Sequence, residues 1–235
     1  MYKDKKILAV ITARGGSKSI PRKNITELCG RPLISYTIAA AQKSRYLTRS
    51  IVSTDDLEIA EISKKYGADV PFMRPLELAQ DQSTSLEAAN HALDWLKKNN
   101  NEEYDYLMIL QPTSPLRSSE DIDGCIIKAV DTGADSVMSM KELEDFSVKK
   151  IKIIEDDLIK PWQEEEGSYS RRRQDQEKVF KRNCAVYLTK TEFIRQNDLF
   201  GKISRPYLMP AERSVDINGM FDLKLAELLL SKNDR

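Results

Sequence analysis

Short apolar runs alternate with amphipathic stretches along the first 140 residues of the chain. The runs at 7–12, 51–53, 106–110 and 136–140 are rich in aliphatic and β-branched residues, which predicts buried strands. Helical spacing of apolar residues predicts helices that begin near 33, 57, 85 and 119. This order predicts an α/β fold with a Rossmann-like, mostly parallel sheet and helices on both faces.

The pattern changes after residue 140. Residues 141–178 are strongly charged, and a short alternating stretch with a turn at 155–157 predicts an exposed hairpin. Three aromatic residues are unexpected in a segment that only has to stay solvated: Phe146, Trp162 and Tyr169. We therefore interpret the excursion as an arm that packs on a second subunit, with a purely solvated hairpin as the alternative.

The alternation of apolar and amphipathic stretches resumes after residue 178 and continues to the end of the chain. A buried strand is predicted at 185–188, and helices are predicted at 191–196 and 221–230. The last helix has an expected apolar face of Phe221, Leu225 and Leu228. Residues 1–140 and 179–235 are thus assigned to one core, and residues 141–178 to a dimerisation excursion.

Composition narrows the possible functions of the 235-residue chain. Lys and Arg together number 37, as do Asp and Glu, so a nucleic-acid partner is not expected. The mean hydropathy is −0.50, and no apolar run approaches the roughly 20 residues of a membrane span. Cys29, Cys125 and Cys184 form no CxxC pair, which favours reduced thiols and a cytoplasmic location. The single histidine, His91, lies in a helical pattern and is interpreted as structural, which disfavours a Ser-His-Asp triad.

The segment 13–24, which directly follows the first strand, is the richest candidate site. Its adjacent glycines can expose backbone N–H groups, and four cations surround them: Arg14, Lys18, Arg22 and Lys23. Open α/β sheets bind ligands at this end of their strands, so the segment predicts a nucleoside triphosphate site, with a solvated basic turn as the alternative. It matches neither a Walker A motif nor a GxGxxG fingerprint, which disfavours an ordinary kinase or dehydrogenase.

Four segments together resemble one family, the CMP-sialic acid synthetases (N-acylneuraminate cytidylyltransferases). They are ITARGGSKSIPRKN from residue 11, MRPLELAQD at 73–81, LQPTSPLR at 110–117 and SVDINGMFDL at 214–223. The resemblance implies transfer of CMP from CTP to a sialic acid-type nonulosonic acid, with release of pyrophosphate. It also implies Mg2+ as cofactor and a homodimer.

The resemblance also assigns expected roles to residues of this chain. CTP-binding residues would be Arg14, Gly15, Gly16, Ser17, Lys23, Asn24, Arg74 and Asp81, with Arg14, Lys23 and Asp216 taking part in catalysis. Sugar-binding residues would be Gln111, Thr113, Ser114, Arg173 and Asn183. Asp216 and Asn218 would hold the metal, because alternation along a strand places both side chains on one face.

Two departures from the family pattern keep other functions open. The stretch Lys181-Arg182-Asn183-Cys184 stands where the family has Arg-Pro-Asn-Gly, and Asn218 replaces an aspartate. A legionaminic or pseudaminic acid substrate, a 3-deoxy-manno-octulosonate cytidylyltransferase and a catalytically weakened CTP-binding relative are therefore alternatives. A protein-protein adaptor without a ligand is a further one. Asp216 and Asp222 could also simply cap the final helix.

Overall fold

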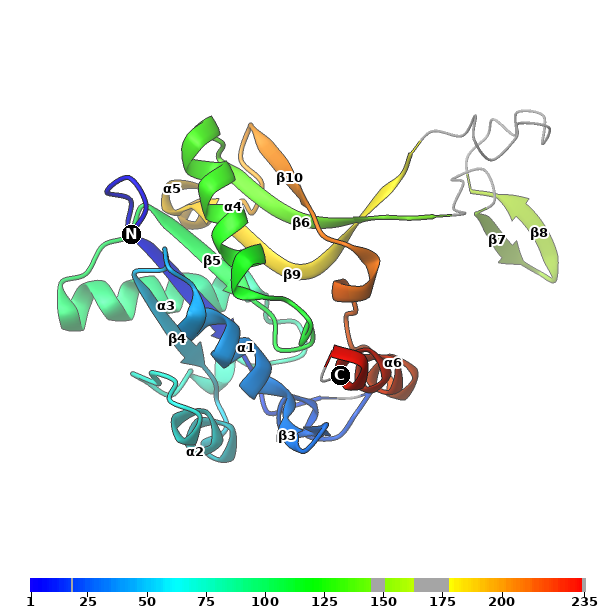
Figure 1. Cartoon of the computed structure of the whole chain (residues 1–235), viewed down its shortest axis with the longest axis horizontal. Coiled ribbons are helices and arrows are strands. Elements are labelled where there is room, and N and C mark those ends of the chain that lie inside the picture. The colour runs from blue at the N-terminus through cyan, green and yellow to red at the C-terminus, as the bar shows by residue number, and fades with distance from the viewer. Residues whose placement is uncertain (18, 145–150, 163–177, 234–235) are drawn as a thin grey trace.

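The computed structural model describes residues 1–17, 19–144, 151–162 and 178–233. Its centre is a six-stranded sheet with strand order β10-β6-β9-β5-β1-β4 (Figure 1). The strands of this sheet are β1 (Ile7–Thr12), β4 (Arg49–Ser53), β5 (Tyr106–Leu110), β6 (Ser136–Glu142), β9 (Phe180–Lys190) and β10 (Ser204–Leu208). The predicted first and third strands are confirmed at the same boundaries.

Most neighbouring strands of the sheet run parallel, as predicted. Strand β1 pairs in parallel with β4 and β5, and β6 pairs in parallel with β10. Strand β9 is antiparallel to both β5 and β6, and it begins earlier than the expected residue 185. Because β9 runs in the opposite direction, its first residues reach the edge of the sheet where β5 and β6 end. This edge carries the candidate site.

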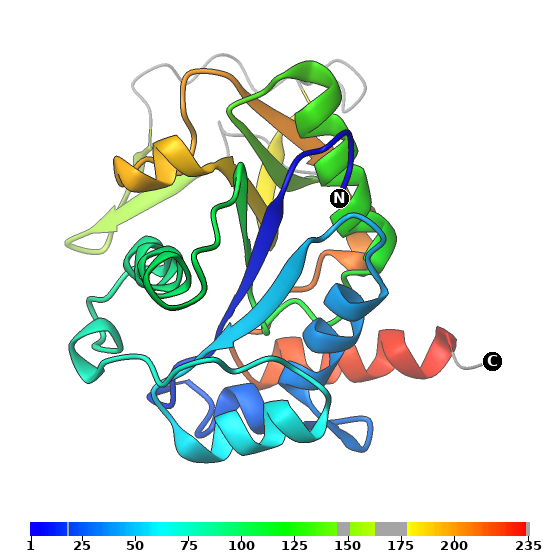
Figure 2. The same cartoon turned by 90° about the vertical axis from the view of Figure 1, so that its left-hand side faces the viewer.

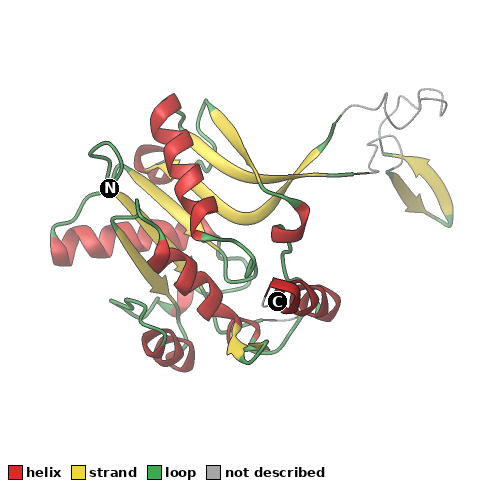
Figure 3. Ribbon diagram, viewed as in Figure 1, coloured by secondary structure: helices red, strands yellow, loops and turns green. Residues whose placement is uncertain are grey.

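The helices cover both faces of the sheet (Figures 2 and 3). They are α1 (Leu33–Lys43), α2 (Leu57–Lys65), α3 (Ser85–Asn100), α4 (Ser119–Thr132), α5 (Thr191–Arg195) and α6 (Met220–Asn233). Short 3-10 turns occupy Lys23–Ile25, Leu76–Leu78 and Ala211–Arg213. No helix within the described ranges has both the length and the apolar character needed to cross a membrane.

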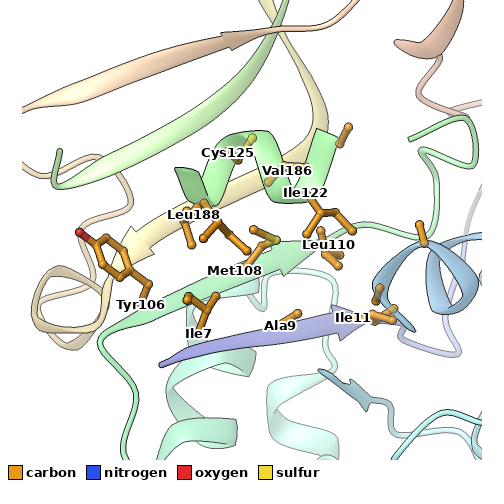
Figure 4. Close-up of a cluster of buried hydrophobic side chains, with 14 of the residues drawn as sticks. Ile7, Ala9, Ile11, Tyr106, Met108, Leu110, Ile122, Cys125, Val186 and Leu188 are labelled. Atoms are coloured by element: carbon orange, nitrogen blue, oxygen red, sulfur yellow. The ribbon is translucent and has the colours of Figure 1, made fainter. Parts of the chain in front are cut away.

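Alternation along β1 divides the core between the two faces. Ile7, Ala9 and Ile11 pack under α1, α2 and α4, as Figure 4 shows for the α4 residues Ile122 and Cys125. Leu8 and Val10 point the other way, into a second cluster with α3 and α5. The sheet is thus buried on both sides, which holds its carboxyl edge rigidly.

The excursion contains a two-stranded hairpin, in agreement with the predicted pattern. Strands β7 (Lys152–Glu155) and β8 (Leu158–Pro161) are joined by Asp156 and Asp157, whose φ angles are 51° and 63°. The hairpin lies apart from the large sheet in Figure 1. Two of the three aromatic residues that suggested an arm, at 146 and 169, fall outside the described residues.

The predicted apolar face of the last helix is wrong for the single chain. Leu223 and Ala226 are the buried residues of α6, with 5% and 0% of their surface exposed. Phe221 and Leu228 instead expose 80% and 54%. The helix is apolar on more than one side, so helical spacing alone did not identify the side that packs on the chain's own core.

Candidate active site

A cavity of about 400 Å3 opens at the carboxyl ends of β1 and β5, and we call it the loop cavity. Its wall contains most residues expected to bind the nucleotide, together with two expected to bind the sugar. These are Arg14, Gly16, Ser17, Lys23, Asn24, Arg74, Asp81, Gln111 and Thr113. Residues separated by up to a hundred positions in the sequence therefore surround one space.

The paired glycines have different tasks. The N–H of Gly15 donates to Asp55 Oδ1 at 3.0 Å, and a Cβ on Gly15 would lie 2.8 Å from Asp56 Oδ2. Gly16 has no atom within 4 Å of its Cβ position and lines the cavity. The expectation that both glycines offer N–H groups to a ligand is thus corrected: Gly15 anchors the loop to the start of α2, and Gly16 faces the open space.

The cations of the loop are also directed differently. Arg22 turns away from the cavity to Asp56, at 2.7 Å, and to Glu58. Arg14 Nη1 donates to the Gln80 carbonyl at 2.8 Å and pairs with Asp81 at 3.1 Å, which joins the loop to the segment before α3. The fourth cation, at position 18, lies outside the described residues. Arg14 and Lys23 are therefore the loop cations on the cavity wall.

Arg74 places a buried positive charge at the same wall. Only 6% of its surface is exposed, and its guanidinium donates to the hydroxyl and the carbonyl of Ser53. Burial lowers the pKa of Arg74; Asp55 opposes the shift, and nearby Arg14 adds to it. Two guanidinium groups that repel each other beside one cavity produce a positive potential that an anionic ligand would relieve.

A second cavity of about 400 Å3 lies beside the final helix, and we call it the α6 cavity. Its wall includes Asn183, Asp216, Asn218 and Asp222, together with cations from β6 and β9. Asp216 and Asn218 line the α6 cavity, and Ile217 between them is hydrogen-bonded to two residues of the loop-cavity wall. Ile217 N–H donates to the Thr113 carbonyl at 2.8 Å, and Lys23 Nζ donates to the Ile217 carbonyl at 3.0 Å. The cation loop and the expected metal residues are therefore neighbours.

The side chains of Asp216 and Asn218 lie together, on one side of this segment. Asn218 Nδ2 donates to Asp216 Oδ2 at 3.1 Å. Asp222 accepts the N–H groups of Asn218 and Gly219, both at 2.9 Å, so this carboxylate caps α6 whereas Asp216 does not.

The donor set at this wall suits a hard cation. Within the described residues, no group of three Asp, Glu, His or Cys side chains could enclose a metal. Mg2+, however, is commonly held by one or two protein oxygen donors while phosphate oxygens of the substrate and waters complete its coordination. Asp216 and the amide oxygen of Asn218 fit that mode.

The α6 cavity is lined by three acidic residues, Glu212, Asp216 and Asp222, and by three cations, Lys141, Lys181 and Arg182. Lys141 of β6 lies directly opposite Lys181 of β9, and like charges at such a position destabilise a sheet. Neither lysine is in an ion pair within the described part of the chain. Arg182 lies next to them, with its guanidinium 5.3 Å from the centre of the Phe200 ring. Such a cluster is suited to a carboxylate ligand.

Two of the expected sugar residues are buried, contrary to the sequence interpretation, and a third lies outside the described residues. Ser114 is 1% exposed and donates to the Asn183 carbonyl at 3.5 Å, so the structure places it in the interior rather than on a cavity wall. Asn183 is 2% exposed; its amide donates to Ser214 Oγ at 2.8 Å, although the residue lines the α6 cavity. Arg173 lies outside the described residues.

The backbone conformation at Cys184 is one that favours the glycine found at this position in the family that the sequence resembles. Its φ of 63° lies in the left-handed region that favours glycine. The thiol contacts the Tyr187 hydroxyl and the Asp216 carboxylate. Burial raises the pKa of this thiol above its usual range, and the nearby Asp216 adds to the shift. This chain therefore places a side chain where a glycine would leave space.

Several wall residues escaped the sequence analysis. The hydroxyl-bearing run Ser83, Thr84 and Ser85 lines the loop cavity, and Lys141 lines the α6 cavity. The run could have been noticed because it follows Asp81 and opens a helix, where Thr84 forms a capping box with Glu87. No local signal marks Lys141. His91 packs edge-on against Phe72, with ring centres 4.7 Å apart, in agreement with a structural role.

The chain is similar to known proteins in sequence. Residues 8–209 match the family model described as cytidylyltransferase. The chain is 32% identical to the pseudaminic acid cytidylyltransferase of Campylobacter jejuni (strain 81-176), over 97% of each chain. It is 34% identical to the CMP-N,N'-diacetyllegionaminic acid synthase of Legionella pneumophila, also over 97% of each chain.

Similarity extends to solved structures. CMP:2-keto-3-deoxy-manno-octonic acid synthetase complexed with CTP superimposes with a TM-score of 0.71 at 15% identity, covering 97% of this chain and 99% of the other. The 4-diphosphocytidyl-2C-methyl-D-erythritol synthase of Anaerococcus prevotii gives 0.65 at 16% identity, with 97% and 99% covered. These two likenesses concern the fold.

Proposed function

Because the chain belongs to the cytidylyltransferase family and is a nucleotidyltransferase, we propose that it transfers CMP from CTP to the anomeric oxygen of a sialic acid-type nonulosonic acid. The observation that carries the proposal is the pair of hydrogen bonds that Ile217 makes with Thr113 and Lys23. They bring a cation-lined cavity next to a cavity with metal donors and with two lysines that have no ion pair among the described residues. A triphosphate in the first cavity and an acidic sugar in the second would lie next to each other.

The reaction requires in-line positioning more than covalent help from the protein. The anomeric oxygen forms a bond to the α-phosphorus of CTP, the bond from that phosphorus to the bridging oxygen breaks, and pyrophosphate leaves while the hydroxyl proton is released. Arg14, Lys23 and Arg74 stabilise the negative charge of the three phosphoryl groups, and Asp81 helps to enclose the nucleoside. Gly16 leaves room for the phosphate chain because it has no side chain there.

We place the acidic sugar in the α6 cavity, at the side that borders the loop cavity. Gln111 and Thr113 reach it from the loop cavity, and Lys141, Lys181 and Arg182 hold its carboxylate from the α6 cavity. Arg173, which the family resemblance assigned to the sugar, stays a proposed contributor. Asp216 and Asn218 would hold Mg2+, which supplies charge neutralisation at the reacting phosphate.

A pyrophosphate-release assay with CTP and Mg2+ tests this function. We expect turnover with at least one of pseudaminic, legionaminic and N-acetylneuraminic acids, and little turnover when UTP replaces CTP. Turnover with 3-deoxy-manno-octulosonate alone would replace the proposed substrate class. Calorimetric CTP binding without turnover on any acid would identify a catalytically weakened relative.

We also propose that the protein is a homodimer held by two exposed apolar surfaces. On the hairpin, Ile154 and Ile159 are directly opposite each other and each exposes 74% of its surface. On α6, Phe221 and Leu228 face solvent. A helix that is apolar on both sides is typical of one that is covered on both sides in the assembled protein.

Sedimentation of two double variants tests the dimer. Ile154→Asp combined with Ile159→Asp, and Phe221→Asp combined with Leu228→Asp, should each shift the protein from dimer to monomer while the circular dichroism spectrum is kept. A wild-type protein that sediments as a monomer would contradict the proposal. The three cysteines, none of which forms a disulfide, accord with the cytoplasmic location that we also propose.

A further inference from the structure

A buried arginine is bound to the backbone of the segment 111–113, which lines the loop cavity. Arg117 follows the β5 loop and exposes 3% of its surface. Its Nη1 donates to the Ala185 carbonyl at 2.8 Å and to the Gln111 carbonyl at 3.3 Å, and its Nη2 donates to Thr37 Oγ1 at 2.6 Å. One side chain thus joins α1, the β5 loop and β9.

Arg117 has no carboxylate hydrogen bond among the described residues. Asp121, which acts on it through space, is already paired with Arg213 at 2.8 Å and closes the capping box of α4. Burial lowers the pKa of Arg117 to about 10, with Asp121 opposing the shift, so the guanidinium is still charged at neutral pH. Burying an unpaired cation is costly, which indicates that its hydrogen bonds serve a purpose beyond stability.

The acceptors of Arg117 show what it controls. The Gln111 carbonyl also receives the Thr37 hydroxyl at 3.5 Å, so the peptide group of Gln111 is held from two sides. Two residues later, the Thr113 carbonyl accepts the N–H of Ile217. The segment that Arg117 fixes therefore carries Gln111 on the wall of the loop cavity and also holds the irregular segment that contains Asp216.

We propose that Arg117 is a positioning residue that orients Gln111 toward the acidic sugar and fixes the segment 111–113 against Ile217. This inference rests on the proposed function for the identity of the sugar, but the positioning itself is a property of the unliganded protein. Arg117 touches neither cavity: it acts through the backbone of Gln111.

Amide hydrogen exchange without substrates tests the positioning directly. The variant is Arg117→Lys, which keeps a cation but replaces a planar fork with an ammonium group whose three N–H donors all leave one nitrogen and do not match the positions of the three acceptors. The N–H of Ile217 should exchange at least about tenfold faster, while the N–H of Ala13, bound to Ser53 at the same sheet edge, should change less than about twofold. Equal rates for Ile217 in both proteins would overturn the proposal, as would an equal acceleration of both amides.

A matched control is available in Arg49→Lys. The Arg49 guanidinium is also bound to more than one group, Asp69 and Glu102, but Arg49 lies at the amino end of β4, whereas the cavities lie at the carboxyl edge of the sheet. This control should leave the exchange of Ile217 unchanged. An acceleration as large as that of Arg117→Lys would mean that the effect is general destabilisation.

Kinetics separate positioning from mere support of the fold. Arg117→Lys should raise the KM for the sugar acid about tenfold and leave CTP affinity within about twofold. When Gln111→Ala is already present, Arg117→Lys should raise the KM for the sugar acid by less than about a further twofold, because the Gln111 side chain through which Arg117 acts is absent. Full multiplication of the two effects would overturn the role assigned to Gln111.

Thr37 offers a milder pair of variants should Arg117→Lys fail to fold. Thr37→Val removes the hydroxyl that contacts both Arg117 and Gln111. It should accelerate the exchange of the Ile217 N–H and raise the KM for the sugar acid, by less than Arg117→Lys does. Thr37→Ser keeps the hydroxyl and should give wild-type values. No difference between the two would overturn the proposal. If the wild type makes no CMP-sugar at all, the proposed function fails, while the exchange measurement still decides whether Arg117 positions the segment.

Discussion

The loop cavity and the α6 cavity are linked by the hydrogen bonds of Ile217 but are built in different ways. Much of the loop cavity comes from one continuous stretch, 13–24, whose backbone is held by Asp55 and by the Asn24 amide at 2.8 Å from the Arg14 carbonyl. The α6 cavity gathers residues from β6, β9, the segment before α6 and α6 itself. A local motif therefore describes the first cavity well, and long-range packing decides the second.

Charge differs between the cavities as well. In the loop cavity, Arg14 is paired with Asp81, so a ligand must compete with an existing contact. In the α6 cavity, Lys141 and Lys181 lie side by side without acidic partners in the described chain. The proposed nucleotide side follows the pattern of the resembled family more closely than the proposed sugar side, which departs from it at Lys181, Arg182 and Cys184.

The largest effect is expected for substitution of Asp216. Asp216→Ala should lower kcat by about 100-fold or more, because it removes the carboxylate donor of the expected metal site, while CTP affinity measured by calorimetry changes little. Asp222→Asn is the control, since that side chain caps α6 instead. Loss of sugar affinity alone in Asp216→Ala would move Asp216 from the metal site to the sugar site.

The next effect distinguishes two cations of the same loop. Arg14→Ala should weaken CTP binding by about 10- to 100-fold, the range for losing a charged hydrogen bond. Arg22→Ala, which removes a cation bound to Asp56 and Glu58, should weaken it far less. Equal losses in calorimetry would show that the net charge of the loop, and not the direction of each side chain, determines affinity.

A smaller effect tests the sugar half. Lys181→Met and Lys141→Met should each raise the KM for the acid about tenfold and leave the KM for CTP unchanged. Lys43→Met, at the exposed end of α1, serves as the control. A change in the KM for CTP of the same size would show that the two cavities bind the same ligand group.

The smallest effect separates the paired glycines. Gly15→Ala should lower the free energy of unfolding by about 1–3 kcal/mol, because its Cβ would press on Asp56. Gly16→Ala should leave thermal stability unchanged, since no atom lies within 4 Å, yet reduce CTP affinity by narrowing the cavity. Equal melting temperatures for both variants would contradict the anchoring role of Gly15.

Some elements of the fold were hidden from the sequence for a physical reason. Strand β10 carries Pro206 and exposed residues because it is an edge strand, so it lacks the apolar run that marks a buried strand. The start of β9 is equally polar because it extends past β5 to the site. The packing side of α6 was mistaken because both of its sides are apolar.

The sequence by itself determined the alternation of strands and helices, the cation-rich loop after β1 and the pairing of Asp216 with Asn218, because these depend on spacing between near neighbours. Only the tertiary structure decided which glycine anchors the loop, that Arg22 turns away, that Ser114 is buried and that Lys141 meets Lys181. Those outcomes depend on contacts between segments far apart in the chain, and the direction of β9, which brings its first residues to the site, arises only when the sheet assembles.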